Sequence, residues 1–252
     1  MALDLAGVQA RLPGRRIDWF RSVNSTMTLA SQLARDGCAS GTVIGADEQV
    51  AGIGRHGHAW HSEAEAGVYV SFVLRPELGA ERLPVVMLAL GLATQEAIAQ
   101  VTGVAADLRW PNDVMIDGKK CAGILAQLEG SAIVAGIGIN VNHTAFPEEL
   151  RSIATSLRIE TGHEYEKEAL LERIVAGSLT CAALLECVGK GDILKQFEDQ
   201  SSYARGKAVE VNDGNRVFSG VTAGLDENGF LRVETAGGIE TVMAGGVRAT
   251  VR

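Results

Sequence analysis

The feature that most restricts the fold of this chain is an Asp117-Gly118 pair between two short apolar runs, residues 114–116 and 121–128. Asp-Gly in this setting is a strong signal for a β-hairpin, because both residues of the tight turn must adopt a positive φ angle. The pair therefore predicts two neighbouring antiparallel strands near the middle of the chain.

The predicted hairpin brings three polar side chains together. Asn112 and Asp113 lie just before the first strand, in a Trp-Pro-Asn-Asp turn, and Lys120 opens the second strand. Because the strands return side by side, we expect Lys120 beside Asn112 and Asp113 at one end of a sheet. An amide, a carboxylate and an ammonium group suit phosphate or carboxylate chemistry. Taken alone, the segment could equally be a structural turn beside a solvated lysine.

The composition is that of an ordinary globular protein. The 252 residues are 46% hydrophobic and 21% charged, and they leave room for one large domain, or a large domain with a small one. The net charge of −8 argues against binding nucleic acid through the overall field. The start of the chain does not resemble a secretory signal, and the longest apolar stretch is interrupted by polar residues. We therefore expect a cytoplasmic protein with no membrane segment.

The cysteines show no CxxC spacing and no histidine partners at zinc spacing. We expect reduced, mostly buried thiols rather than a disulfide or metal framework. The four positions are Cys38, Cys121, Cys181 and Cys187.

Apolar periodicity predicts an α+β fold over the first 200 residues, with a mixed β-sheet and helices packed against it. Strands are expected at residues 17–23, 42–47, 68–74, 108–110, 114–116, 121–128 and 133–141. Helices are expected from the capping residues 24–26 to Gly37, and at residues 83–101, 166–187 and 193–200. Residues 48–66, rich in Gly, His and Glu, have no apolar period and are expected to form a loop.

The pattern changes from Gly206 onward. Short strands are separated by turn signals roughly every 8–12 residues, such as those at 212–215, 226–229 and 237–238. This spacing predicts a small all-β barrel or sandwich. We place the domain boundary between residues 1–203 and 204–252.

Three further polar segments could bind a ligand, and each also has a plain structural explanation. Residues 52–58 (Gly-Ile-Gly-Arg-His-Gly-His) allow backbone amides and the Arg55 guanidinium to approach an anion, or form a flexible surface loop. Ser25 and Thr26 could cap a helix, line an anion site at its N-terminus, or do both. Asn140 ends a strand, where structural asparagines are common.

Taken in order, these segments resemble the motifs of the biotin protein ligases. The order is Ser25-Thr26, Gln49, Gly52-x-Gly54-Arg55-x-Gly-x-x-Trp60, Trp110-Pro-Asn112-Asp113, Lys120-x-Ala-Gly-Ile-Leu and Gly138-Ile-Asn140. The resemblance runs from about residue 17 to the C-terminus. It implies a catalytic domain of the class II synthetase type at residues 1–203 and a small SH3-like barrel at residues 204–252.

The resemblance implies a two-step reaction. The biotin carboxylate attacks the α-phosphate of MgATP, which gives biotinyl-5′-AMP and pyrophosphate, and a lysine of a biotin carboxyl carrier protein then attacks the mixed anhydride. The implied small molecules are ATP, Mg²⁺ and biotin, and the implied partner is the carrier domain. Two anions must meet in the first step, so cationic and amide donors are needed to neutralise them.

The resemblance also implies a role for each site residue. The catalytic residues are Lys120, Arg55 and Asp113, with Asp113 able to accept the proton of the attacking amine. The biotin-binding residues are Ser25, Thr26, Gln49, Gly52, Arg55 and Lys120. The nucleotide-binding residues are Gly54, Arg55, Trp60, Asn112 and Asn140. No residues are assigned to the metal.

Several positions depart from the family pattern. Ile53 and His58 stand where the family has loop arginines, Arg109 stands for a lysine, and Met27 for a frequent asparagine. These changes bear on the affinity of the loop and on the contacts with biotin.

Two alternative functions stay open at this point: lipoate or octanoyl transfer on the same fold, and a non-catalytic biotin-binding regulator. Some family members carry a DNA-binding domain before the ligase domain. Only about 16 residues precede the first predicted strand here, so we expect no DNA binding. A homodimer is possible.

Overall fold

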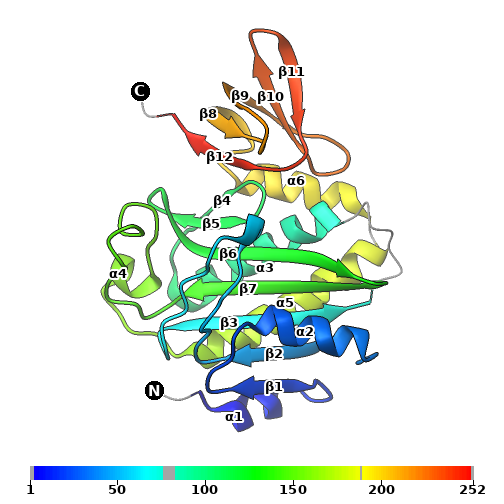
Figure 1. Ribbon diagram of the computed structural model, residues 1–252, viewed down its shortest axis with the longest axis vertical. Coiled ribbons are helices and arrows are strands. Elements are labelled where there is room, and N and C mark those ends of the chain that lie inside the picture. Colours follow the sequence, from blue (N-terminus) through cyan, green and yellow to red (C-terminus); the bar gives the residue numbers. More distant parts are fainter. Residues whose placement is uncertain (1–2, 76–82, 188, 251–252) are drawn as a thin grey trace.

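The computed structural model describes residues 3–75, 83–187 and 189–250, without the side chains of residues 181–187. A seven-stranded sheet has the strand order β1-β2-β3-β7-β6-β5-β4 (Figure 1). Its strands are β1 (Ile17–Phe20), β2 (Thr42–Ala46), β3 (Gly67–Leu74), β4 (Asp107–Arg109), β5 (Asp113–Ile116), β6 (Lys119–Glu129) and β7 (Ala132–Asn140). The β1–β2 pair is parallel and the other pairs are antiparallel, so the expected mixed sheet is confirmed.

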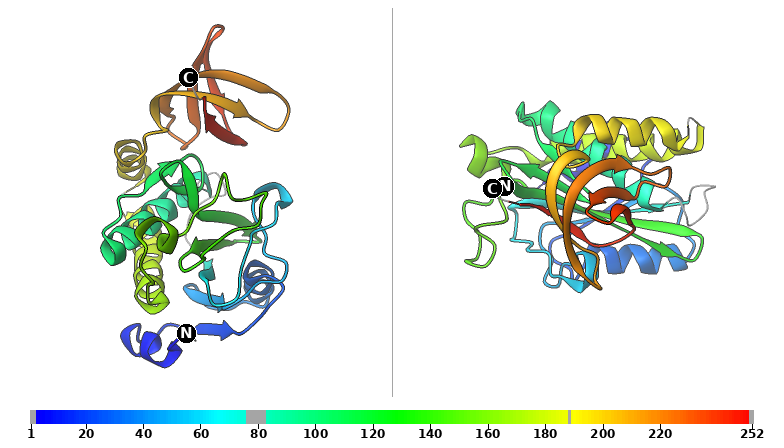
Figure 2. Two further views of the ribbon diagram at one scale, coloured as in Figure 1. Left: turned by 90° about the vertical axis from the view of Figure 1, so that its left-hand side faces the viewer. Right: turned by 90° about the horizontal axis from the view of Figure 1, so that it is seen from above.

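Helices cover both faces of this sheet, as Figure 2 shows. One face packs against α2 (Thr26–Arg35), and the other against α3 (Leu83–Thr102) and α5 (Lys167–Cys187). Each face therefore has its own hydrophobic core. The remaining helices are α1 (Leu5–Arg11), α4 (Leu157–Thr161) and α6 (Lys190–Gln200).

The two shortest α-helices, α1 and α4, were not expected from the sequence. Neither is long enough to show an apolar period, and each is stabilised by a side-chain N-cap. Asp4 accepts from the amide of Gly7, and Ser156 accepts from that of Ile159, both at 3.0 Å. The expected strand at residues 17–23 ends at Phe20, and Val23 forms only an isolated bridge with Gln49.

Helix α3 is long and apolar enough to cross a membrane when judged by length and composition alone. However, 61% of its most apolar window is buried inside the protein, where it packs against α5 and the sheet. The core of a globular domain explains the apolar character of this helix.

The hairpin between β5 and β6 is confirmed. Asp117 and Gly118 have φ angles of 48° and 76°, as a tight turn between twisted strands requires. Asp113 pairs with Gly123 across the two strands, and a bulge after Val114 shifts the register near the turn. Lys120 pairs with Met115, nearer the turn, and its side chain reaches back to the Asp113 carboxylate.

A second, five-stranded antiparallel sheet follows, with the order β11-β10-β9-β8-β12. Its strands are β8 (Arg205–Asn212), β9 (Val217–Leu225), β10 (Leu231–Thr235), β11 (Gly238–Val242) and β12 (Gly246–Ala249). This strand arrangement is consistent with an SH3-like barrel, although β11 and β12 are not paired with each other among the described residues.

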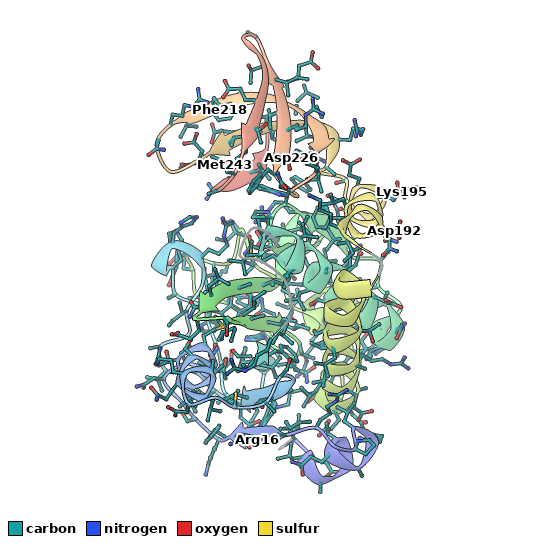
Figure 3. All side chains as sticks on the ribbon, turned by 90° about the vertical axis from the view of Figure 1, so that its right-hand side faces the viewer. Arg16, Asp192, Lys195, Phe218, Asp226 and Met243 are labelled. Carbon is teal, nitrogen blue, oxygen red and sulfur yellow. The ribbon has the colours of Figure 1, made fainter. Side chains whose placement is uncertain are left out.

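The turn after β9 fixes the second sheet on the first domain. The Asp226 carboxylate accepts hydrogen bonds from the amides of Asn228 and Phe230, and it lies on the side of the small domain that faces the larger one (Figure 3). The indole N–H of the buried Trp110 donates to the Gly229 carbonyl at 2.9 Å. Trp110 thus joins the two sheets as well as filling a turn.

Two of the four cysteines can be compared with the expectation. Cys38 and Cys121 are free thiols; Cys121 is buried and Cys38 is partly exposed. Burial raises the pKa of Cys121 to about 12, which makes it unreactive. The side chains of Cys181 and Cys187 lie outside the described residues.

Candidate active site

Two connected hollows lie at the end of the large sheet nearest the small domain. The inner pocket lies on the α2 face of the sheet and is lined by Thr26, Gln49, Gly123, Gly136, Gly138 and neighbouring residues. The outer cavity is larger, lies between the domains and is lined by Arg109, Asp113, Asn140, Asn212, Gly245 and their neighbours. Five residues line both hollows: Gly54, Arg55, Trp60, Asn112 and Lys120.

Glycines form the floor of the inner pocket. Gly123 of β6 pairs with Gly138 of β7, and Gly136 lies two residues further along the same face. A Cβ atom on Gly138 would lie 2.5 Å from the Trp60 indole, and one on Gly136 would lie 2.7 Å from the sulfur of Met27. The absence of side chains at these glycines therefore lets Trp60 and Met27 pack close against the sheet and form the walls of the pocket.

Polar groups line one wall of the inner pocket. The side-chain oxygen of Gln49 accepts from the backbone N–H of Thr26 at 2.9 Å and from its hydroxyl at 3.1 Å. The Gln49 amide nitrogen donates to the Ser62 hydroxyl at 2.9 Å, and the hydroxyls of Thr26 and Ser71 are 2.8 Å apart. Gln49 therefore positions the start of α2 against the sheet.

Ser25 occupies the N-cap position of α2, but the expected capping hydrogen bond from its side chain is absent. Instead, the first backbone N–H of the helix, that of Thr26, donates to the side-chain oxygen of Gln49. The Ser25 hydroxyl is buried without a hydrogen-bond partner among the described residues. Such a group is costly to bury, so a polar ligand atom would satisfy it.

A charge cluster lies where the two hollows meet. The Lys120 ammonium is 2.6 Å from Oδ1 of Asp113, and Arg109 donates to Oδ2 of the same carboxylate at 2.6 and 3.1 Å. Burial alone would raise the pKa of Asp113, but the two cations together hold it below its ordinary value. Asp113 is therefore ionised at neutral pH, and it orients both cations.

Arg55 connects three parts of the site. It follows Gly54 in the loop, and its guanidinium donates to the Asn112 side chain at 3.2 Å and to the Gly245 carbonyl of the small domain at 2.8 Å. Burial lowers the pKa of Arg55, while the charge of Asp113 acts in the opposite direction. Arginine stays charged even so, because its ordinary pKa is above about 12.

The remaining residues of the predicted site shape its walls. Trp60 lies over the glycine floor, 5.0 Å from the Lys120 ammonium, and its indole N–H is buried without a partner among the described residues. Asn112 donates to the Ile124 carbonyl at 3.0 Å, which fastens the turn to β6. Asn140 donates to the Thr155 carbonyl at 3.0 Å and faces the outer cavity.

Gly52 and Gly54 are required by close backbone contacts in the loop. A Cβ on Gly52 would lie 2.6 Å from the Trp60 carbonyl oxygen, and one on Gly54 3.1 Å from that of His58. The amide of Gly54 also donates to His58 at 2.7 Å. The loop expected at residues 48–66 is confirmed, with a single 3₁₀ turn at Arg55–Gly57.

The structure thus brings most of the residues that the sequence singled out to the lining of two adjoining spaces, whereas Ser25 and Gly52 line neither of them. Sequence reasoning did not identify the alternating glycines as a pocket floor, nor Ser71 as the partner of the Thr26 hydroxyl. It also missed Gly245, which approaches Arg55 from 190 residues away. The glycine floor had a signal, since Gly136-Ile-Gly138 inside a strand indicates close approach of another group. Gly245 had none, because only the docking of the two domains brings it near.

Comparison with known proteins gives a consistent result. The model of the biotin/lipoate A/B protein ligase family matches residues 19–143, and that of the biotin protein ligase C-terminal domain matches residues 205–247. The bifunctional ligase/repressor BirA of Bacillus subtilis is 31% identical over 94% of this chain and 74% of its own length. The biotin–[acetyl-CoA-carboxylase] ligase of Mycobacterium tuberculosis is 30% identical over 92% of this chain and 88% of its own.

A solved structure extends the match to the fold. The biotin protein ligase of Aquifex aeolicus, in complex with biotin and ATP, superposes with a TM-score of 0.85 at 30% identity, covering 93% of this chain and 99% of that one. Both sheets are included in that coverage. This chain therefore belongs to the biotin protein ligase family.

Proposed function

We propose that this protein is an ATP-dependent biotin protein ligase, which forms biotinyl-5′-AMP and transfers biotin to a lysine of a biotin carboxyl carrier protein. The observation that carries the proposal is the position of Lys120. Its ammonium lies where the inner pocket, with its glycine floor and its Thr26 and Gln49 wall, adjoins the larger outer cavity. A carboxylate from the first space and a phosphate from the second would meet at this cation.

The inner pocket suits the fused rings of biotin. Trp60 and Met27 pack over its glycine floor and provide apolar faces for a flat ring system. The unpartnered hydroxyl of Ser25 and the side chains of Thr26 and Gln49 offer hydrogen bonds for the polar ureido group. We assign the ring system to this wall, with the valeryl chain directed toward Lys120.

The outer cavity suits MgATP. Arg55, Arg109 and Lys120 supply positive charge, and the amides of Asn112 and Asn140 supply neutral donors. The Asp113 carboxylate is already neutralised by two cations, so we assign it no metal. Mg²⁺ would accompany the phosphates of ATP and offset their charge.

In the first step an oxygen of the biotin carboxylate attacks the α-phosphorus, and the bond to pyrophosphate breaks. Lys120 and Arg55 reduce the repulsion between the two anions and stabilise the charge that develops on the phosphoryl oxygens. Asp113 keeps Lys120 in position through the 2.6 Å ion pair. The Arg55 contact with Gly245 keeps the loop closed against the small domain.

In the second step the neutral amine of the carrier lysine attacks the acyl carbon, AMP leaves, and the amine loses a proton. The lowered pKa of Asp113 makes it a weaker proton acceptor than the resemblance implied. We therefore assign Asp113 mainly to positioning Lys120 and Arg109. The adenylate phosphate or solvent is then available to take the proton.

Several finer points remain predictions. These are the division into residues 1–203 and 204–252, the absence of DNA and membrane partners, the cytoplasmic location and the possible homodimer. Lipoate or octanoate ligation remains the second candidate, because the matching family model covers both biotin and lipoate ligases. No feature of the pocket favours it.

The proposal is tested by pyrophosphate release with MgATP and each of biotin, lipoate and octanoate. We expect release with biotin alone. Release with lipoate but not biotin would transfer the assignment to the second candidate. No pyrophosphate release with any of the three acids would contradict an enzymatic function and favour a non-catalytic biotin-binding regulator.

A further inference from the structure

A group of metal-binding side chains lies beside the active site and takes no part in the proposed reaction. His61, Glu63 and His143 each offer one ligand atom, and these atoms lie within 4.8 Å of one another. His61 and Glu63 belong to the segment that follows Trp60, and His143 comes three residues after β7 ends. Two segments far apart in the sequence therefore meet at this point.

His143 is fixed and fully buried. Its side chain has no exposed surface, its ring stacks on Phe146 with centroids 5.0 Å apart, and its carbonyl accepts from the Ser156 hydroxyl at 2.7 Å. The ring therefore has little freedom to turn toward another partner.

Tyr69 determines which nitrogen of His143 is free. The Tyr69 hydroxyl donates to the Glu63 carbonyl at 3.1 Å, and its oxygen is 3.2 Å from Nε2 of His143. Because the hydroxyl proton is already used, the tyrosine oxygen accepts, and Nε2 carries the proton of the neutral ring. Nδ1 then has a bare lone pair, and it is buried without a partner among the described residues.

From this geometry we propose that His61, Glu63 and His143 form a binding site for Zn²⁺ or a similar transition-metal ion. Two imidazoles and one carboxylate are a known zinc ligand set that leaves a fourth position for water. The site is distinct from that of Mg²⁺, which prefers six oxygen ligands. The hydrogen bond between His143 and Tyr69 is the outer contact that orients a ligating histidine.

The distances allow the site to close around an ion. Ligand atoms around a tetrahedral zinc lie about 3.3 Å apart, since each bond is about 2.0 Å. The nitrogen of His61 is 3.9 Å from the Glu63 carboxylate, and their side chains are 33% and 52% exposed. Small rotations of these two side chains are sufficient, while His143 stays fixed. The same exposure gives an ion access from solvent.

A bound ion would hold the end of the ligand loop to the end of β7. His61 is directly bonded to Trp60, which covers the inner pocket, and His61 itself lines the outer cavity. Metal binding by His61, Glu63 and His143 does not require the proposed reaction to occur.

The test is a titration of the full chain, without a polyhistidine tag, with Co²⁺ as a coloured substitute for Zn²⁺ and millimolar Mg²⁺ present throughout. We expect one equivalent to bind, with visible absorption of four- or five-coordinate cobalt and no thiolate charge-transfer band. Zn²⁺ should displace the cobalt and raise the thermal midpoint of unfolding. No binding, or a thiolate band, would overturn the proposal.

Variants assign the ligands. His61→Ala and Glu63→Gln change a half-buried and an exposed side chain and should each weaken binding by at least about tenfold. The exposed His163→Ala is the control and should bind as wild type. Tyr69→Phe should weaken binding by about tenfold or more, because it removes the group that orients His143. Equal affinity in His61→Ala, Glu63→Gln and the control would overturn the proposal.

Discussion

The inner pocket and the outer cavity are built in different ways. The inner pocket is built within the larger domain, from its sheet, α2 and the loop of residues 48–66, and local features such as the alternating glycines of β6 and β7 shape it. The outer cavity depends on the docking of two domains, and its lining includes the cations Arg55, Arg109 and Lys120. Under the proposed function, the shape of the inner pocket selects biotin, whereas the charged groups at its junction with the outer cavity stabilise the reacting anions.

The largest effect is expected at the junction itself. Lys120→Ala removes a preorganised cation from the reacting centre, so the rate of biotinyl-adenylate formation should fall by about 10²–10³. The measurement is pyrophosphate release in a single turnover. Lys119→Ala is the matched control, since the neighbouring strand residue lies on the other face and should be nearly neutral. Equal losses of rate in the two variants would show that Lys120 has no special role in adenylate formation.

The ion pairs of Asp113 with Lys120 and Arg109 should contribute to the free energy of unfolding. The pKa of Asp113 is lowered in the folded state, so its stabilising contribution is present above the unfolded value of about 3.9 and is lost as pH falls through the folded value. Asp113→Asn should lower the free energy of unfolding by roughly 3 kcal/mol at pH 7.

The difference between wild type and Asp113→Asn should shrink steadily below about pH 4. Denaturant unfolding of both proteins across that range measures it. A constant difference from pH 7 down to pH 2 would mean that the carboxylate contributes nothing through its charge.

The shape of the inner pocket is tested by Gly138→Ala. The new Cβ would lie 2.5 Å from the Trp60 indole, so the ring must shift into the space for the ligand. Overpacking of this kind costs about 1–3 kcal/mol, and we expect biotin affinity to fall roughly tenfold or more, with ATP affinity little changed. Gly191→Ala is the control, because its Cβ would meet open space. Equal losses for biotin and ATP would contradict the division between the two spaces.

The smallest effect should come from the contact between the domains. Gly245 has a φ angle of 112°, and a Cβ there would overlap the Asn212 carbonyl, so Gly245→Ala displaces the oxygen that holds Arg55. Loss of this hydrogen bond should speed dissociation of biotinyl-5′-AMP by about three- to tenfold, while biotin affinity stays near that of wild type. Stopped-flow fluorescence of the adenylate complex measures the rate, and Gly237→Ala is the control in an open turn of the same domain. Weaker biotin binding without faster dissociation of the adenylate would show that the Arg55–Gly245 contact supports biotin binding rather than retention of the adenylate.

The same contrast explains what the sequence could predict. The hairpin at Asp117-Gly118 and the pairing of Lys120 with Asp113 follow from local turn chemistry and strand geometry, and both were predicted. The Arg55–Gly245 contact depends on domain docking, which no local pattern encodes. The missing side-chain cap at Ser25 had a similar cause, because Gln49, more than twenty residues away, supplies the oxygen.

The most direct test of the central claim is the mass of a biotin carboxyl carrier domain after incubation with this protein, biotin and MgATP. The account predicts a gain of one biotinyl group on the acceptor lysine, and no gain when that lysine is replaced by arginine or when ATP is omitted. An unmodified carrier in the complete reaction, with the protein shown to be folded, would contradict it.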